Sequence, residues 1–218
     1  MNPYAFIFDM DGVIVDSNPF HKTSLKQFCS KYGFDLSEED LIKKIYGRTN
    51  KEWIPNLFGK LSKEQLQAYA VEKEALFREL YKDDIVAISG LEGFLKEIQK
   101  AGYPIAIGTS APRANVDFTL SKTNLGAYFP VILDESFVDH GKPNPEIYLK
   151  VAAALNMDPK NCIVLEDSLS GVAAGKGAGC KVIGVTTTHS REELAETDYI
   201  IDDFYGLNPK TLVSSLFG

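Results

Sequence analysis

Acidic and polar side chains follow directly after four short apolar runs of the sequence. They are Asp9 and Asp11 after residues 4–8, Thr109 and Ser110 after residues 104–107, Asp134 and Glu135 after residues 131–133, and Glu166 and Asp167 after residues 162–165. Continuous apolar runs of this length are typical of strands buried on both faces of a parallel sheet. Ligands of such sheets bind outside the carboxyl ends of the strands. We therefore expect Asp9, Thr109 and the acidic pair at 166–167 to meet at one edge of a sheet.

Carboxylates that lie this close together favour the binding of a cation. Their charges repel one another, so the groups either raise their pKa values or hold a positive ion. Oxygen-only ligands favour a hard ion, and Mg²⁺ is typically held by one or two carboxylates together with substrate phosphate. The alternative is that Asp9 and Asp11 only form a turn, because Asp-Gly is a common turn pair. The second acidic pair, at another strand end, favours the Mg²⁺ site.

The elements that would position these residues alternate along most of the chain. Further apolar runs lie at residues 182–185 and 199–201, and apolar residues follow helical spacing over 91–98 and 147–155. Strands that alternate with helices predict βαβ units with right-handed crossovers. The predicted fold class is therefore α/β, a Rossmann-like parallel sheet with helices on both faces.

A helical segment interrupts this alternation. It contains no clear strand, and its candidate helices are 20–31, 37–45, 51–58 and 62–80, the last opened by a Ser62–Gln65 capping box. The Glu- and Lys-rich stretch 69–78 is most simply a solvated helix face. The predicted organisation is a catalytic core of residues 1–17 and 88–218, with an α-helical cap domain of residues 18–87 inserted into it.

The composition is that of an ordinary globular enzyme. The chain has 218 residues, of which 44% are hydrophobic, and a formal net charge of −7. That charge argues against nucleic-acid binding, which depends on Lys and Arg, and no apolar run approaches the roughly 18 residues of a membrane span. Cys29, Cys162 and Cys180 are widely spaced, which indicates buried thiols in a reducing compartment. The amino-terminal residues lack a signal-peptide pattern, so we expect a cytoplasmic location.

In order and spacing, these residues resemble the four motifs of the haloacid dehalogenase superfamily. The motifs are Asp9-Met10-Asp11-Gly12-Val13, Thr109 after an apolar strand, Lys142 in Gly141-Lys142-Pro143-Asn144-Pro145, and Glu166-Asp167-Ser168 followed by Gly171. The place of the helical insertion, after the first motif, is similar to that in the subfamily of β-phosphoglucomutase and many small phosphatases. The resemblance covers the whole chain, and it rests on four motifs in order rather than on any one of them.

The resemblance implies a site for phosphoryl transfer. Asp9 would be the nucleophile that forms an aspartyl-phosphate, and Asp11 would be the general acid and base. Mg²⁺ would be held by Asp9, the backbone carbonyl of Asp11, Asp167 and Glu166. Displacement of halide from carbon needs neither the acid at position 11 nor the ion, so the complete pattern argues against dehalogenation.

Further core residues would bind the phosphoryl group. The resemblance implies that Thr109 and the Ser110 amide hold phosphoryl oxygens, with Lys142 close by as a point charge. The alternative for Lys142 is an exposed loop lysine, but Pro143 and Pro145 fix its loop.

The cap is expected to recognise the rest of the substrate. Asp16-Ser17 followed by His21 resembles the hinge pattern of the β-phosphoglucomutase-like group. This resemblance implies that His21 senses cap closure or contacts the site; the alternative is a histidine satisfied within a helix. The residues similar to the substrate loop of the cap are Tyr46, Gly47, Arg48, Thr49 and Asn50; the alternative is a plain connecting loop. True mutases place a Lys before this glycine and an Arg three residues after it, where this chain has Tyr46 and Asn50. Arg48 and Arg113 could act as substitutes.

These expectations favour a Mg²⁺-dependent phosphatase that hydrolyses a small phosphomonoester, such as a sugar phosphate, through an aspartyl-phosphate. The alternative is a β-phosphoglucomutase-like phosphotransferase. A catalytically idle binding protein is less well supported, because every residue needed for turnover is present. The expected partner is a small phosphorylated metabolite; neither nucleic acid, membrane nor a protein partner is indicated.

Overall fold

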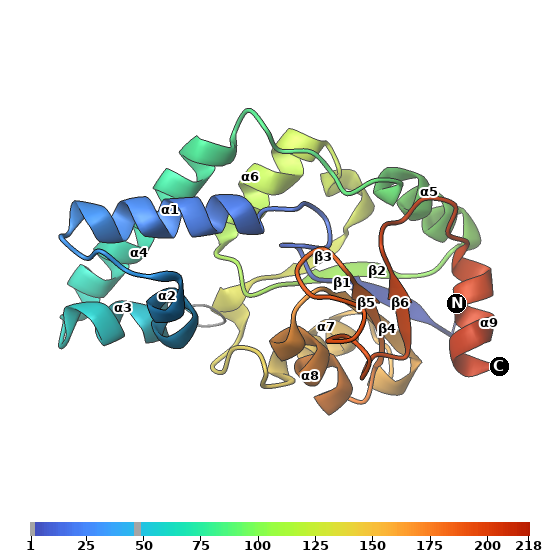
Figure 1. Ribbon diagram of the computed structural model, residues 1–218. Coiled ribbons are helices and arrows are strands. Elements are labelled where there is room, and N and C mark those ends of the chain that lie inside the picture. Colours follow the sequence, from blue (N-terminus) through green and yellow to red (C-terminus); the bar gives the residue numbers. More distant parts are fainter. Residues whose placement is uncertain (1–2, 46–48) are drawn as a thin grey trace. The chain divides into compact units, whose positions relative to one another are not determined.

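The computed structural model describes residues 3–45 and 49–218, and its main feature is a parallel sheet of six strands (Figure 1). The strands are β1 (Ala5–Phe8), β2 (Ile105–Gly108), β3 (Val131–Leu133), β4 (Cys162–Glu166), β5 (Lys181–Val185) and β6 (Tyr199–Ile201). Their spatial order is β3-β2-β1-β4-β5-β6, and every neighbouring pair is parallel. The strand order reverses between β1 and β4, which is where ligands bind in sheets of this kind. The predicted α/β class is confirmed.

Helices cover both faces of this sheet (Figure 1). The core helices are α5 (Leu91–Ala101), α6 (Arg113–Thr123), α7 (Glu146–Ala154), α8 (Leu169–Gly177) and α9 (Pro209–Phe217), with short 3₁₀ turns at Gly126–Tyr128, Glu135–Phe137 and Pro159–Asn161. The alternation of side chains along β1 explains the two layers. Ala5 and Ile7 pack with residues of α7 and α8, whereas the ring of Phe6 meets Phe94 of α5 edge to face at 5.8 Å.

The chain divides into two compact units. One consists of Met1–Asp16 and Ile85–Gly218, and the other of Ser17–Asp84. The predicted boundaries, at 17/18 and 87/88, differ from these by up to three residues. Within the first unit, the ends of the insertion are joined by an antiparallel bridge between Val15 and Ala87 and by a hydrogen bond from the Ile88 amide to the Ile14 carbonyl, 2.9 Å.

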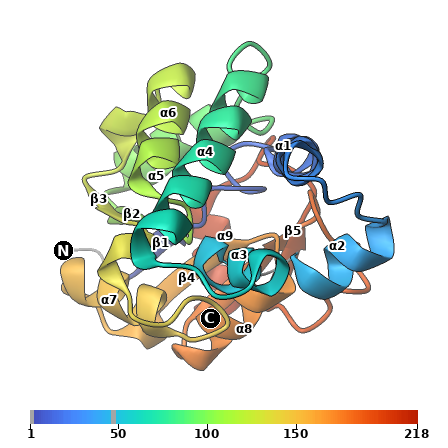
Figure 2. The same cartoon turned by 90° about the vertical axis from the view of Figure 1, so that its left-hand side faces the viewer.

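The second unit is helical over its described residues. Its helices are α1 (Asn18–Lys31), α2 (Glu38–Lys44), α3 (Asn50–Phe58) and α4 (Lys63–Tyr81). Helices α1 and α4 lie side by side, and α3 packs against α4 (Figure 2). An aromatic cluster that includes Phe28 and Trp53 fills the space between them. The expected capping box opens α4: the Gln65 amide donates to Ser62 Oγ, and the Ser62 amide donates to Gln65 Oε1.

The structure also shows the state of the cysteines and the character of the helices. Cys29, Cys162 and Cys180 are buried free thiols, as predicted. Among the described residues, no helix combines the length and the apolar character that a membrane crossing requires.

Candidate active site

The side chain of Asp9 is held at the end of the central strand. Asp9 directly follows β1, and its amide donates to the Leu165 carbonyl of β4 at 3.0 Å, which continues the parallel ladder past the strand. The chain then turns sharply, with the Ile14 amide bonded to the Met10 carbonyl at 2.8 Å and Asp11 half-buried within the turn. A fixed backbone at this point gives the buried Asp9 carboxyl a defined direction.

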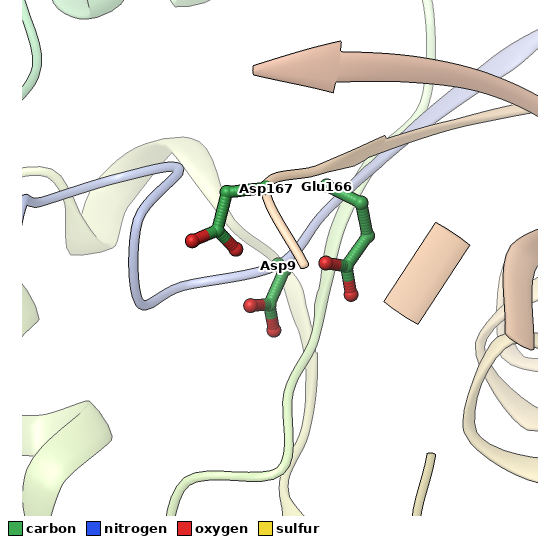
Figure 3. A group of neighbouring side chains, drawn as sticks. All are labelled: Asp9, Glu166 and Asp167. Atoms are coloured by element: carbon green, nitrogen blue, oxygen red, sulfur yellow. The ribbon is translucent and has the colours of Figure 1, made fainter. Parts of the chain in front are cut away.

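Asp9, Glu166 and Asp167 form a buried acidic cluster, as Figure 3 shows. One carboxylate oxygen of each lies within 4.8 Å of the others. The register explains the meeting, because β1 and β4 are neighbours that pair Phe8 with Leu165, the residues just before Asp9 and Glu166. The sequence-based expectation that these strand ends converge therefore agrees with the geometry.

Two glycines allow the carboxylates to approach the backbone. Gly12 has a φ of +77°, and a Cβ there would lie 1.9 Å from Asp167 Oδ2. A Cβ on Gly171 would lie 1.8 Å from Glu166 Oε1. Both glycines belong to the quoted motifs, but their role as space for the carboxylates was not predicted, because a sequence does not show which atoms press against a backbone.

Lys142 joins two members of the cluster. Its Nζ donates to Asp9 Oδ1 at 2.8 Å and to Glu166 Oε1 at 2.6 Å, and its side chain is only 6% exposed. The alternative of an exposed loop lysine is therefore wrong. Because a single ammonium bridges two carboxylates, the orientation of Asp9 depends on where Glu166 is held.

Glu166 is itself held by further donors. The Tyr148 hydroxyl donates to the same Oε1 at 2.5 Å. The other oxygen, Oε2, accepts from the amide of Ser168 at 3.2 Å and from its hydroxyl at 3.0 Å. Tyr148 was expected to belong to the buried face of its helix, which it does, but its contact with Glu166 was not predicted. The available signal was a tyrosine on an apolar helix face, since a buried phenol needs a hydrogen-bond partner.

The electrostatics of the cluster favour a bound cation. Burial raises the pKa of Asp9 to about 7, against the opposing charge of Lys142. Burial and the neighbouring charges of Glu166 and Asp9 raise the pKa of Asp167 well above its usual value. Burial lowers the pKa of Lys142, but the two carboxylates outweigh it and leave this pKa above its usual value. One lysine does not offset three carboxylates, so a divalent ion would stabilise their charged forms.

The neighbouring strands contribute hydroxyl groups at the same edge. Thr109 follows β2, its amide donates to the Leu133 carbonyl at 3.1 Å, and its hydroxyl accepts from the Ala111 amide at 3.1 Å. Ser110 is exposed next to it. Beyond β5, the Thr188 hydroxyl donates to Asp167, a contact that was not predicted.

Arg113 is not part of the acidic cluster. It begins α6, and its guanidinium pairs with Asp117 one turn along at 2.8 Å, with 58% of its side chain exposed. This pair lies on the surface of the helix.

In the helical unit, a buried charge network surrounds His21. Its Nδ1 lies 3.0 Å from Lys73 Nζ, and its ring stacks on Phe77 with 3.7 Å between centroids. Lys73 pairs with Glu74 at 2.8 Å, and these residues are only 4% and 6% exposed. The prediction of a solvated face over 69–78 is therefore wrong at these positions. Their charges are buried because they neutralise each other.

The expected substrate loop of the cap is only partly described. Gly47 and Arg48 lie outside the described residues, as does Tyr46. Thr49 is the N-cap residue of α3, and Asn50 is its first helical residue. The Asn50 side chain donates to Glu74 Oε1 at 2.9 Å and accepts from Trp53 Nε1 at 2.9 Å. Thr49 and Asn50 thus belong to a helix start rather than to a loop.

Comparisons with known proteins match more than four fifths of the chain. A family model described as haloacid dehalogenase-like hydrolase matches residues 6–185. The chain is 35% identical over 184 residues to a phosphorylated carbohydrates phosphatase of Thermotoga maritima, covering 82% of this chain and 83% of the relative. It resembles the structure of a HAD hydrolase, family IA, variant 3 from Entamoeba histolytica, with a TM-score of 0.89, 30% identity and coverage of 99% and 100%. It also resembles a β-phosphoglucomutase from Clostridium difficile, with a TM-score of 0.83, 26% identity and coverage of 97% and 96%.

Proposed function

This chain belongs to the haloacid dehalogenase-like hydrolase family, and from that premise we propose that it hydrolyses the phosphate ester of a small metabolite, such as a sugar phosphate, with Mg²⁺ as its cofactor. The observation that carries the proposal is the buried cluster of Asp9, Glu166 and Asp167 with Lys142 bonded to Asp9. Similarity to a phosphatase of phosphorylated carbohydrates supports the substrate class.

Asp9 is the proposed nucleophile. Lys142 holds its Oδ1, which leaves the other carboxylate oxygen to attack phosphorus in line with the ester oxygen. A bond forms between Asp9 and phosphorus while the bond from phosphorus to the leaving oxygen breaks, and Asp11 gives that oxygen a proton. Asp11 then takes a proton from water, which attacks the aspartyl-phosphate, releases inorganic phosphate and restores the Asp9 carboxylate.

The donor set fits a magnesium ion. Three buried carboxylates offer one oxygen each within 4.8 Å of one another, and hard cations prefer oxygen ligands. Asp9, Glu166 and Asp167 would hold the ion, together with the backbone carbonyl of Asp11. When bound, it neutralises negative charge on the transferring phosphoryl group.

The remaining core residues bind and orient the phosphoryl group. We propose that the Thr109 hydroxyl and the Ser110 amide, which follow the strand next to β1, donate to phosphoryl oxygens. Lys142 keeps its positive charge because two carboxylates surround it. We propose that the helical unit is the cap that recognises the rest of the substrate.

A β-phosphoglucomutase-like phosphotransferase is the second candidate, favoured by the structural similarity to such a mutase. A mutase has to exclude water until its cap grips a second phosphate, and charge-assisted bonds from cations supply that grip. Asn50 carries no charge and its amide is bonded to Glu74, and Arg113 is paired with Asp117. These two contacts favour the phosphatase.

Product analysis with a panel of phosphate monoesters and Mg²⁺ tests the proposal. We expect release of inorganic phosphate from at least one sugar phosphate. Incubation with β-glucose 1-phosphate and a priming bisphosphate separates the two candidates: excess glucose 6-phosphate over inorganic phosphate would establish the mutase. If neither product forms from any ester, both candidates fail.

A further inference from the structure

Tyr148 lies beside the proposed catalytic residues without being one of the motif residues. It is on α7, its side chain is fully buried, and its hydroxyl donates to Glu166 Oε1 at 2.5 Å. Lys142 donates to that same oxygen at 2.6 Å, and its Nζ lies 4.9 Å from the centre of the Tyr148 ring. Tyr148 therefore contacts both Glu166 and Lys142.

The hydroxyl is more than a satisfied core group. A phenol buried on an apolar helix face could bond to any nearby carbonyl, but this one bonds to a charged oxygen at a distance typical of strong O–H···O⁻ bonds. The neighbours Ile147, Val151 and Ala152 on the same helix pack in the apolar core. The ring thus fills core space, while the hydroxyl is directed at the carboxylate that holds Lys142.

Glu166 Oε1, which accepts from both Tyr148 and Lys142, influences the relative strength of the two hydrogen bonds that Lys142 donates. Its ammonium is bonded to Glu166 at 2.6 Å and to Asp9 at 2.8 Å. Each donor to a carboxylate oxygen reduces the negative charge available to the others. Without the phenol, Oε1 would attract the ammonium more strongly and would itself be less fixed. Lys142 would then move toward Glu166, and the bond that orients Asp9 would lengthen.

We propose that Tyr148 is a positioning residue for phosphoryl transfer, which fixes Glu166 so that Lys142 stays bonded to Asp9. This inference rests on the proposed function, because it assigns Asp9 as the attacking group. The Tyr148 hydroxyl acts through its bond to Glu166, so its removal should slow the chemical step and leave substrate binding nearly unchanged.

The test compares Tyr148→Phe with Tyr103→Phe. Both changes remove one tyrosine hydroxyl, but Tyr103 is only partly buried, precedes β2 and packs edge to face on Phe6, at the opposite end of the sheet. With enzyme in excess over p-nitrophenyl phosphate, we expect Tyr148→Phe to lower the single-turnover rate constant about tenfold, because part of the hydrogen bond to the charged Glu166 stabilises the transition state. KM should stay within about twofold of the wild-type value, because the substitution removes no contact that binds the substrate equally in the ground state and in the transition state.

These readouts separate positioning from a structural role. As long as active enzyme stays saturating and in excess over the substrate, an inactive fraction does not change the single-turnover rate constant. A purely structural tyrosine would therefore leave the rate constant at the wild-type value and overturn the proposal. A rate constant lowered equally by Tyr103→Phe would also overturn it.

Proton NMR supplies a measurement that needs neither turnover nor a variant that is fully folded. The short bond to Glu166 should give the wild-type protein a strongly downfield phenol proton, which persists in Tyr103→Phe. If that resonance is missing from the wild-type protein, the proposed hydrogen bond is wrong. If the wild-type protein shows the resonance but hydrolyses no ester, both the proposed function and the positioning role are refuted. If the enzyme is active and the Tyr148→Phe variant is unaffected, only the positioning role is refuted.

Discussion

Replacing Gly171 with alanine tests whether the position of Glu166 controls both stability and activity. Gly171 is the third residue of α8, after the N-cap Ser168, and Gly93 is the third residue of α5, after the N-cap Gly90. The two sites therefore offer the same substitution at the same helical position. A Cβ on Gly93 would have nothing within 4 Å, whereas a Cβ on Gly171 would strike the Glu166 carboxylate.

The expected effect follows from the overlap. The added Cβ would lie 1.8 Å from Glu166 Oε1 and 1.9 Å from its Cδ, so the carboxyl group has to retreat by more than about 1 Å to reach ordinary contact. That movement breaks the bonds from Tyr148 and Lys142. Disrupting a buried ion pair typically costs about 3–5 kcal/mol, whereas alanine stabilises a helix by roughly 0.5–1 kcal/mol relative to glycine. The free energy of unfolding should fall by about 2–4 kcal/mol.

Urea unfolding and phosphate release measure the two consequences. We expect Gly171→Ala to lower kcat/KM about 100-fold or more, because a misplacement of about 1 Å in catalytic geometry costs that much. Gly93→Ala should keep full activity and gain up to about 1 kcal/mol of stability. If Gly171→Ala is as stable and as active as Gly93→Ala, the reasoning about the carboxylate is refuted.

The other predictions concern the ion, the acid and the buried charges of the helical unit. Exhaustive chelation should abolish phosphate release, and added Mg²⁺ should restore it; undiminished activity after chelation would remove the ion from the mechanism. Asp11→Asn should slow hydrolysis about 10²–10⁴-fold for alkyl phosphates and less for p-nitrophenyl phosphate, whose leaving group needs no proton; equal losses would contradict the acid role. Asp9→Asn should abolish the hydroxylamine-sensitive phosphoenzyme, and labelling at wild-type levels would exclude Asp9 as nucleophile. Burial raises the pKa of Glu74, but Lys73 and other partners outweigh this effect and lower the pKa from 4.5 to about 2. The charged Glu74 therefore contributes up to about 3 kcal/mol to the free energy of unfolding above pH 4.5, and this contribution is lost as the pH falls toward 2. Glu74→Gln should flatten the loss of stability in that range of acid unfolding; an unchanged slope would show that Glu74 is not the titrating group.

The sequence was most informative where chemistry and strand pattern coincide. An apolar run that stops at Asp9, and another that stops at Glu166, were enough to place the two residues together, because neighbouring parallel strands end at one edge. The strand order was not predicted, because the alternation of strands and helices indicates a parallel sheet without showing which strands are neighbours. What these patterns measure is local: which residues are buried, and in which kind of element.

The unpredicted contacts depend on partners that are distant in sequence. Helical spacing correctly made Tyr148 a core residue, but it carries no information about the carboxylate 18 positions away that its hydroxyl meets. Lys73 and Glu74 are adjacent, but their further partners His21 and Asn50 lie 52 and 24 positions away, and a helical pattern does not show such partners. Asn50, a candidate for substrate recognition, bonds to Glu74 across 24 positions. Spacing could reveal none of these partners.

The discontinuous core has a consequence for the order of folding. Strand β1 lies between β2 and β4, whose residues begin at positions 105 and 162. A growing chain therefore carries its first strand without β2 until position 105 and without β4 until position 162, while residues 17–84 can form their own aromatic core. Closing a flexible loop of that length costs about 4 kcal/mol of chain entropy, and early folding of the insertion would shorten the loop before Val15 meets Ala87. A chain cut before residue 162 would expose one edge of β1 to other molecules, so premature termination should yield aggregates rather than a smaller working enzyme.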